Sequence, residues 1–103
     1  MTIRTIGVLG AGTWGMALAR MLCVSGHEVT VWSALPEEID TLSTTRVHKN
    51  LPGMTIPQEL GFTKSIEEVC TGKDIVMFAV PSVFVRSTAA KARPYLQIGR
   101  AHV

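Results

Sequence analysis

The sequence predicts an α/β fold in which a parallel sheet carries helices on both faces. Short apolar segments rich in β-branched residues alternate along the chain with segments of helical periodicity. A glycine-rich turn lies between the first apolar segment and the first helical one. The 103 residues suffice for one domain and are too few for two. The connections between neighbouring parallel strands are expected to be right-handed crossovers.

The first strand, helix and strand are expected within residues 3–32. Ile3–Leu9 is rich in β-branched residues and is followed by a glycine, which predicts a buried strand. Thr13–Ser25 has apolar residues at helical spacing, and Gly26 follows where a glycine commonly ends a helix. Glu28–Trp32 predicts the second strand.

A second helix is expected to open at Leu35-Pro36. Proline is tolerated in the first turn of a helix, and Glu37 and Glu38 are placed well for the helix dipole. This helix is expected to end near Arg46. Val47–Leu60 contains two prolines and a glycine and predicts a loop.

A short strand and a short helix are expected next. Phe62-Thr63 predicts the strand, and Ser65–Glu68 has the pattern of a capping box that opens a helix, which Gly72 closes.

The last strand and helix follow a continuous apolar segment. Asp74–Val80 predicts a strand buried on both faces, as parallel strands commonly are. Pro81-Ser82 turns the chain into a helix over Val83–Leu96, with Pro94 disturbing its last turn.

The glycine-rich turn, Gly10-Ala11-Gly12-Thr13-Trp14-Gly15, has the pattern G-x-G-x-x-G. The pattern alone is weak evidence, but here it follows a predicted strand and opens a predicted helix. Gly10 would permit the tight turn, Gly12 would let a pyrophosphate approach the backbone, and Gly15 would let the helix pack close to the strand. The sequence therefore predicts a Rossmann-type dinucleotide-binding fold, with phosphates held at a helix N-terminus.

A second lip of the expected cofactor crevice comes from the end of Asp74–Val80. In this fold the crossover after the third strand returns beside the first strand, so Val80-Pro81-Ser82 should face the glycine turn. Pro81 is a candidate cofactor contact, and Ser82 is expected to cap the helix. Phe84, one turn into that helix, is either a second contact or a core aromatic.

The residues that would read the cofactor ribose are ambiguous. An acid near the end of the second strand favours NAD and a base favours NADP, but Val31–Ala34 contains neither. Ser33 can bond either form. Arg46 can reach the site only if its helix packs suitably. NAD is slightly favoured.

Composition argues against several classes of function. Ten basic and eight acidic residues give a net charge of +2 without a basic cluster, so nucleic-acid binding is not expected. No apolar run approaches the ~20 residues of a membrane span. Two cysteines, Cys23 and Cys70, do not make a disulfide framework, which indicates reduced thiols in a cytoplasmic protein. A signal peptide is disfavoured because glycines 10, 12 and 15 would interrupt its helix. No catalytic or metal-ligating residue is assigned.

Several motifs together resemble one family. Gly10–Gly15 with its tryptophan, the Leu51-Pro52-Gly53 loop, Ile56-Pro57 and Phe78–Ser82 resemble the N-terminal domain of bacterial NAD(P)-dependent glycerol-3-phosphate dehydrogenases. The resemblance implies hydride transfer between sn-glycerol 3-phosphate and dihydroxyacetone phosphate, which supplies glycerophospholipid precursors. It also implies that Gly10–Gly15 hold the pyrophosphate and that Phe84 contacts the cofactor. A homodimer is the assembly considered for the full-length enzyme, although the sequence does not determine it.

The resemblance covers residues 2 to about 96 and carries further expectations. Residues 1–97 would form the first half of the dinucleotide-binding domain, without the C-terminal substrate domain, so this chain alone is expected to be inactive. Ile98–Val103 matches the translation of a sequencing adapter, which predicts a non-native tail belonging to no element. Family members commonly carry basic residues where this chain has Ser33 and Ala34, which argues against a strong NADP preference.

Two other functions fit parts of the pattern. A related dehydrogenase such as ketopantoate reductase shares the opening fingerprint, but the Leu51-Pro52-Gly53 loop argues against it. A non-catalytic nucleotide-sensing module would be expected to have a complete sheet and an acid at the end of its second strand.

Overall fold

The computed structural model describes residues 4–46, 56–96 and 101–102 of the chain. These residues form five parallel strands in the spatial order β3-β2-β1-β4-β5. The predicted parallel sheet is therefore confirmed. The strands are β1 (Thr5–Leu9), β2 (Glu28–Trp32), β3 (Gly61–Thr63), β4 (Ile75–Phe78) and β5 (Ala101–His102).

Strand β1 lies between β2 and β4 and is buried on both faces. Ile6 and Val8 belong to one buried apolar cluster, whereas Leu9 belongs to the other. This alternation follows from the two-residue period of a strand, in which successive side chains point to opposite faces. The central position of β1 makes its carboxyl end the middle of that edge of the sheet.

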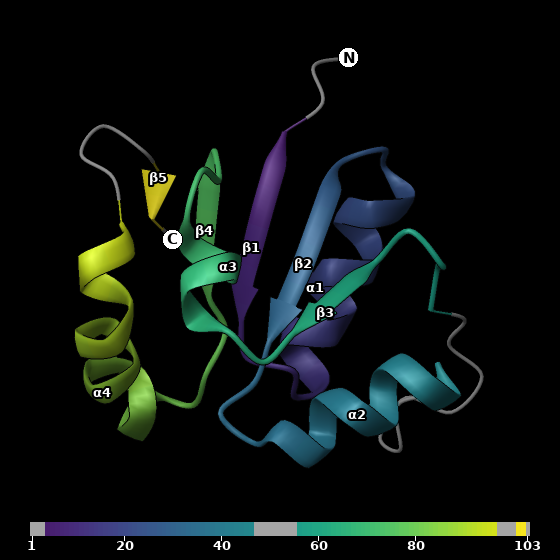
Figure 1. The fold of residues 1–103 in the computed structure, drawn as a ribbon. Helices are drawn as coiled ribbons and strands as arrows, with labels where there is room; N and C mark the ends of the chain where they lie inside the picture. Colours follow the sequence, from purple (N-terminus) through teal and green to yellow (C-terminus); the bar gives the residue numbers. More distant parts are fainter. Residues whose placement is uncertain (1–3, 47–55, 97–100, 103) are drawn as a thin grey trace.

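Helices cover both faces of the sheet, as predicted (Figure 1). The helix α1 (Thr13–Val24) packs on β2, and α2 (Pro36–Thr45) contributes to the same buried cluster as α1. On the opposite face, α3 (Ile66–Cys70) packs on β1 and against α4 (Ser82–Ala92). Each of the four helices begins after a strand has ended, so all four begin near the carboxyl edge of the sheet.

Three helix ends lie where the sequence predicts them. Gly26 follows the last residues of α1 with a φ of 102°, and its N–H donates to the carbonyl of Cys23. Arg46 ends α2 in the left-handed region with a φ of 57°. Pro94 lies in a 3₁₀ turn, Arg93–Tyr95, which tightens the end of α4.

The short helix α3 is capped by a relay of three side chains. Ser65 Oγ accepts from the N–H of Glu68 at 3.2 Å, as a capping box requires. The Glu68 carboxylate does not reach back to the Ser65 N–H. Instead it accepts from Thr63 Oγ1, which itself accepts from the Ser65 N–H at 3.1 Å. Thr63 thus links the end of β3 to the start of α3.

Strand β4 is shorter and less buried than predicted. Val76 is buried, whereas Ile75, Met77 and Phe78 are only half-buried. The expectation of burial on both faces was therefore too strong. A physical reason is that α4 packs against α3 and covers β4 less completely than α1 covers β2.

Strand β5 corrects the expectation that residues 98–103 belong to no element. Ala101 and His102 pair in parallel with Ile75 and Val76 of β4. Such pairing is made by backbone N–H and carbonyl groups alone, so the pattern of side chains does not predict a strand here. The remaining residues of that segment lie outside the described part of the chain, as do Ile3 and the Leu51-Pro52-Gly53 loop.

Candidate functional site

The glycine turn is fixed to both of its neighbouring strands. The N–H of Gly10 donates to the carbonyl of Trp32 at 2.7 Å, which ties the turn to the end of β2. Gly10 has a φ of 130°, a region that L side chains rarely adopt. A Cβ there would also lie 2.7 Å from the carbonyl oxygen of Ala79, which follows β4. The tight turn predicted for Gly10 is confirmed.

Gly15 allows the first turn of α1 to press against this loop. A Cβ at Gly15 would lie 2.2 Å from the carbonyl oxygen of Gly10 and 3.2 Å from the Cβ of Ala79. No rotamer choice relieves a clash between a Cβ and a backbone atom. The close helix packing predicted for Gly15 is therefore confirmed.

Gly12 differs from both of these glycines. A Cβ at Gly12 would have no heavy atom within 4 Å, and its φ of −72° is open to any residue. The fold itself therefore does not require a glycine here. Open space over the backbone at a helix start is what a phosphate group would need in order to approach closely.

The exposed part of the turn coincides with the start of α1. Gly12, Thr13 and Trp14 are exposed, whereas Gly10 and Gly15 are buried. Gly12 is the N-cap of α1, and no side chain caps the first-turn N–H groups. Ala11 is also buried, with its methyl group in the core, so it can meet a ligand only through its backbone. This geometry fits a pyrophosphate held by backbone N–H groups at the N-terminus of a helix.

The expected second lip of the cofactor crevice lies where α4 begins. Pro81 is exposed and is the N-cap of this helix, while Ser82 is its first helical residue. The expected cap by Ser82 is wrong, because a capping oxygen belongs on the residue before the first helical one. Phe84 is 56% exposed, so it is not a core aromatic. Its neighbour Val83 is exposed as well, which leaves apolar side chains at this lip.

Ser33, the residue predicted to meet the ribose, is already engaged. It is buried at the end of β2, and its Oγ donates to Glu38 Oε1 at 2.7 Å. The same oxygen accepts from the N–H of Leu35 at 3.1 Å. A hydroxyl has one proton to donate, so Ser33 has none left for a ribose oxygen. Glu38 was not predicted as a site residue, because it belongs to the first turn of the following helix and not to the end of β2.

Arg46 is turned toward the segment that precedes β3. Its Nη1 donates to the carbonyls of Leu60 at 2.8 Å and Pro57 at 3.3 Å, and its guanidinium lies 5.2 Å from the ring centroid of Phe62. These contacts hold the segment before β3 against the end of α2. Arg46 is therefore a structural residue.

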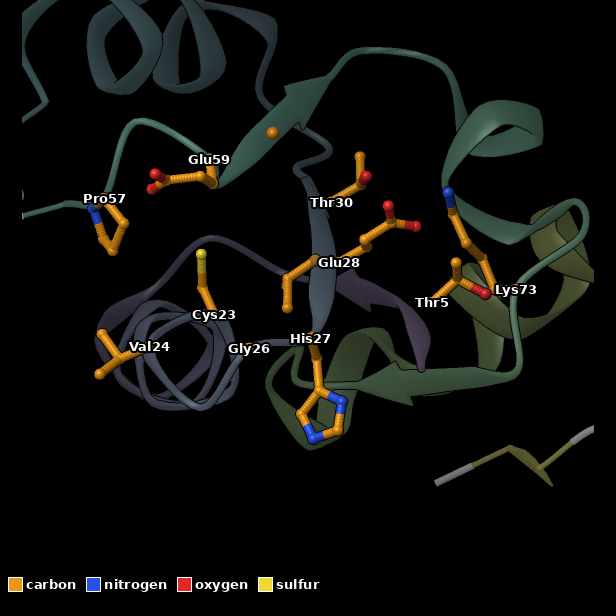
Figure 2. Close-up of a pocket in the computed structure, with 12 residues that line it drawn as sticks. Thr5, Cys23, Val24, Gly26, His27, Glu28, Thr30, Pro57, Glu59 and Lys73 are labelled. Atoms are coloured by element: carbon orange, nitrogen blue, oxygen red, sulfur yellow. The ribbon is translucent and has the colours of Figure 1, made fainter. Parts of the chain in front are cut away.

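A cavity of about 840 Å³ lies at the opposite, amino edge of the sheet (Figure 2). Figure 2 places Cys23 on one side of it and Lys73 on the other, with Glu28 of β2 between them. His27 also lines this cavity, and its Nδ1 accepts from the N–H of Arg4. His27 therefore lies away from the glycine turn.

The two cysteines are buried and unpaired with each other. Burial raises the pKa of the Cys23 thiol, and Glu59 raises it further, while Arg46 opposes the change. Burial also raises the pKa of Cys70. Both groups are protonated at neutral pH and are poor nucleophiles. Within the described segments, no helix is both long and apolar enough to cross a membrane.

The sequence matches one family over nearly its whole length. Residues 5–103 match the family described as the N-terminus of NAD-dependent glycerol-3-phosphate dehydrogenase. The chain is 70% identical over 95 residues to glycerol-3-phosphate dehydrogenase [NAD(P)+] 2 of Lactobacillus delbrueckii subsp. bulgaricus, covering 92% of this chain and 28% of that protein. It is 44% identical over 96 residues to the Agathobacter rectalis glycerol-3-phosphate dehydrogenase [NAD(P)+], and the match covers 92% of this chain and 29% of that protein.

A solved structure has the same fold. The crystal structure of glycerol-3-phosphate dehydrogenase from Coxiella burnetii superposes with a TM-score of 0.90 at 26% identity, covering 97% of this chain and 31% of that one. The chain thus spans less than a third of the length of each of these three relatives.

Proposed function

The chain belongs to the family of the N-terminus of NAD-dependent glycerol-3-phosphate dehydrogenase, and on that premise we propose that it binds NAD or NADP for hydride transfer. The whole enzyme would interconvert sn-glycerol 3-phosphate and dihydroxyacetone phosphate. The bound nicotinamide ring would supply the hydride-carrying chemistry, and residues 1–97 would supply part of the dinucleotide-binding domain. Two free, buried cysteines support a reducing compartment, the cytoplasm.

The open space over Gly12 carries this proposal. In the turn between β1 and α1, the fold itself requires glycine at Gly10 and Gly15 but not at Gly12. A glycine that the fold does not need, at an uncapped and exposed helix start, is explained by a ligand that approaches the backbone. The proposed ligand is the cofactor pyrophosphate, whose charge the first-turn N–H groups and the helix dipole would stabilise.

The remaining predicted residues would act around that anchor. The side chains of Trp14 in α1 and Phe84 in α4 are exposed and would contact apolar parts of the cofactor. Pro81 would shape the second lip. Ser33 would act indirectly, because its hydroxyl positions Glu38.

The chain's two tryptophans offer a test that locates the ligand. Trp14 is 67% exposed beside Gly12, whereas Trp32 is 6% exposed, and its Nε1 donates to the carbonyl of Lys64. We expect NADH to quench tryptophan fluorescence and calorimetry to give the same Kd. Trp14→Phe should remove most of the quenching change. Absence of NADH and NADPH binding by a folded chain would contradict the proposal.

A further inference from the structure

We propose that Glu38 makes this chain prefer NAD over NADP by placing a carboxylate where the 2′ position of the cofactor ribose would lie. The inference rests on the proposed cofactor binding and deepens it. Its starting point is that the end of β2 carries no acid, while the structure brings one there from the first turn of α2.

The position of Glu38 is fixed through Ser33. The 2.7 Å bond from Ser33 Oγ joins a buried hydroxyl to Glu38 Oε1. Ser33 follows Trp32, whose carbonyl accepts from the N–H of Gly10 in the glycine turn. Two short hydrogen bonds and one peptide link therefore connect the proposed pyrophosphate site to the Glu38 carboxylate. In Rossmann-type domains the adenine ribose lies on this side of the pyrophosphate, beyond the end of β2.

Glu38 keeps one oxygen for a ligand. Oε1 is occupied by Ser33, and in the described part of the chain no hydrogen-bond donor is assigned to Oε2. An ionised carboxylate accepts hydrogen bonds and donates none. A ribose 2′-hydroxyl can donate to it, whereas a 2′-phosphate would bring negative charge against negative charge. The hydrogen bond and the repulsion both favour NAD.

The side chains around Glu38 at the start of α2 are mostly acidic. Glu37 lies in the same first turn of α2 and Asp40 lies one turn further on, so the helix start is acidic. Lys64 is a nearby cation, but its Nζ pairs with Asp40 at 2.8 Å. Arg46 is held by the carbonyls of Pro57 and Leu60. Both of these cations, Lys64 and Arg46, thus already have a partner within the described part of the chain.

The experiment compares NADH and NADPH binding to the full 103-residue chain and its variants by fluorescence and calorimetry. We expect wild type to bind NADH at least about tenfold more tightly, in line with a hydrogen bond to a charged group. Glu38→Gln should reduce that ratio to near one. The variant is nearly isosteric, and its amide oxygen can still accept from Ser33.

Glu37→Gln is the matched control, because it removes the same charge from the same helix turn. It should leave the ratio within about twofold, because surface charges contribute little. If both variants changed the affinity ratio equally, the preference would come from the overall charge of the helix start and not from Glu38, and the inference would be overturned. Melting curves establish that each variant is folded.

A measurement on wild type keeps the inference testable if Glu38→Gln does not fold. Charge repulsion predicts that the NADPH-to-NADH ratio of Kd values narrows between about 0.01 M and 1 M salt, as the screening length falls from about 30 Å to 3 Å. A ratio that is independent of salt would overturn the inference. So would wild type that binds NADPH as tightly as NADH, with the proposed function intact. Binding of neither cofactor would instead overturn the proposed function.

Discussion

The two edges of the sheet differ in what they present to solvent. The carboxyl edge offers exposed backbone at Gly12 and exposed apolar side chains at Trp14 and Phe84. The amino edge offers a cavity lined by ionisable groups, among them Glu59 and Lys73 (Figure 2). If volume and charge marked the functional site, the amino edge would be the better candidate.

The difference shows that a dinucleotide site is recognised by backbone geometry. At the carboxyl edge, neighbouring parallel strands leave a crevice between the connections that depart from them, and helix N-termini face it. The hollow at the amino edge lies where α1 returns to β2 and has no such helix start. Substitutions at the two edges should therefore have separable effects on folding, on cofactor binding and on pH dependence.

The largest effect is expected at Gly15. Gly15→Val would place its Cβ against the backbone carbonyl oxygen of Gly10. This clash can be relieved only if the backbone of α1 moves. We expect the free energy of unfolding to fall by at least about 3 kcal/mol, or cooperative folding to be lost. Urea unfolding followed by circular dichroism measures this. A Gly15→Val chain as stable as wild type would show that α1 packs less closely than described.

Gly12→Val should separate binding from folding. The site has open space and an ordinary φ, so we expect the free energy of unfolding to change by less than about 1 kcal/mol. The branched side chain would fill the place of the pyrophosphate, and NADH affinity should fall at least about a hundredfold, equivalent to about 2.7 kcal/mol. Titration of NADH fluorescence measures the affinity. An unchanged NADH affinity in the variant would show that this turn does not bind the cofactor pyrophosphate.

The free energy of unfolding should fall at alkaline pH because the thiols of Cys23 and Cys70 are buried. Both thiols have a raised pKa in the folded chain, so the unfolded chain loses these protons first as the pH rises. Their contribution is therefore complete below the ordinary thiol pKa of 9.0 and is lost as the pH rises through the folded pKa values. Urea unfolding at pH values on either side of that ordinary thiol pKa should show this decline.

Glu59→Gln is the variant that tests the cause. Glu59 raises the pKa of Cys23, so its removal should make the alkaline decline shallower. A decline of unchanged slope in this variant and in Cys23→Ala would assign the effect to other groups.

The smallest effect is expected from charge removal in the amino-edge cavity. Lys73→Met changes a residue that lines the cavity, on the opposite edge from the glycine turn. We expect NADH affinity to stay within about twofold of wild type, since distant exposed charges are screened by salt. A tenfold loss would show that the cavity takes part in cofactor binding.

Most of the fold was predictable because its signals are local. Sequence periodicity gave β2 its full extent, and a single glycine, Gly26, marked the end of α1. The roles of Gly10 and Gly15 also follow from a motif six residues long. The assignment of Gly12, Trp14, Pro81 and Phe84 to the cofactor remains a prediction.

Features that depend on contacts between distant segments were not predictable. The Arg46 guanidinium donates to the carbonyls of Pro57 and Leu60, which lie 11 and 14 residues further along the chain. The residues next to Arg46 in the sequence do not predict these contacts. Glu38 lies only five residues beyond Ser33, but their contact depends on the conformation of the turn between β2 and α2, which the strand and helix patterns do not predict. The pairing of β5 with β4 uses backbone groups, which every residue except proline carries in full.

The attachment of the glycine turn to β2 and β4 has a consequence for the thermodynamics of association. Gly10 is hydrogen-bonded to Trp32 on one side and pressed against Ala79 on the other, and Gly15 is pressed against both Gly10 and Ala79. The turn therefore cannot move independently of the two strands that flank the crevice. A dinucleotide would meet a preorganised frame, and little conformational entropy would be lost in ordering it. Much of the free energy of the phosphate contacts would then appear directly as affinity.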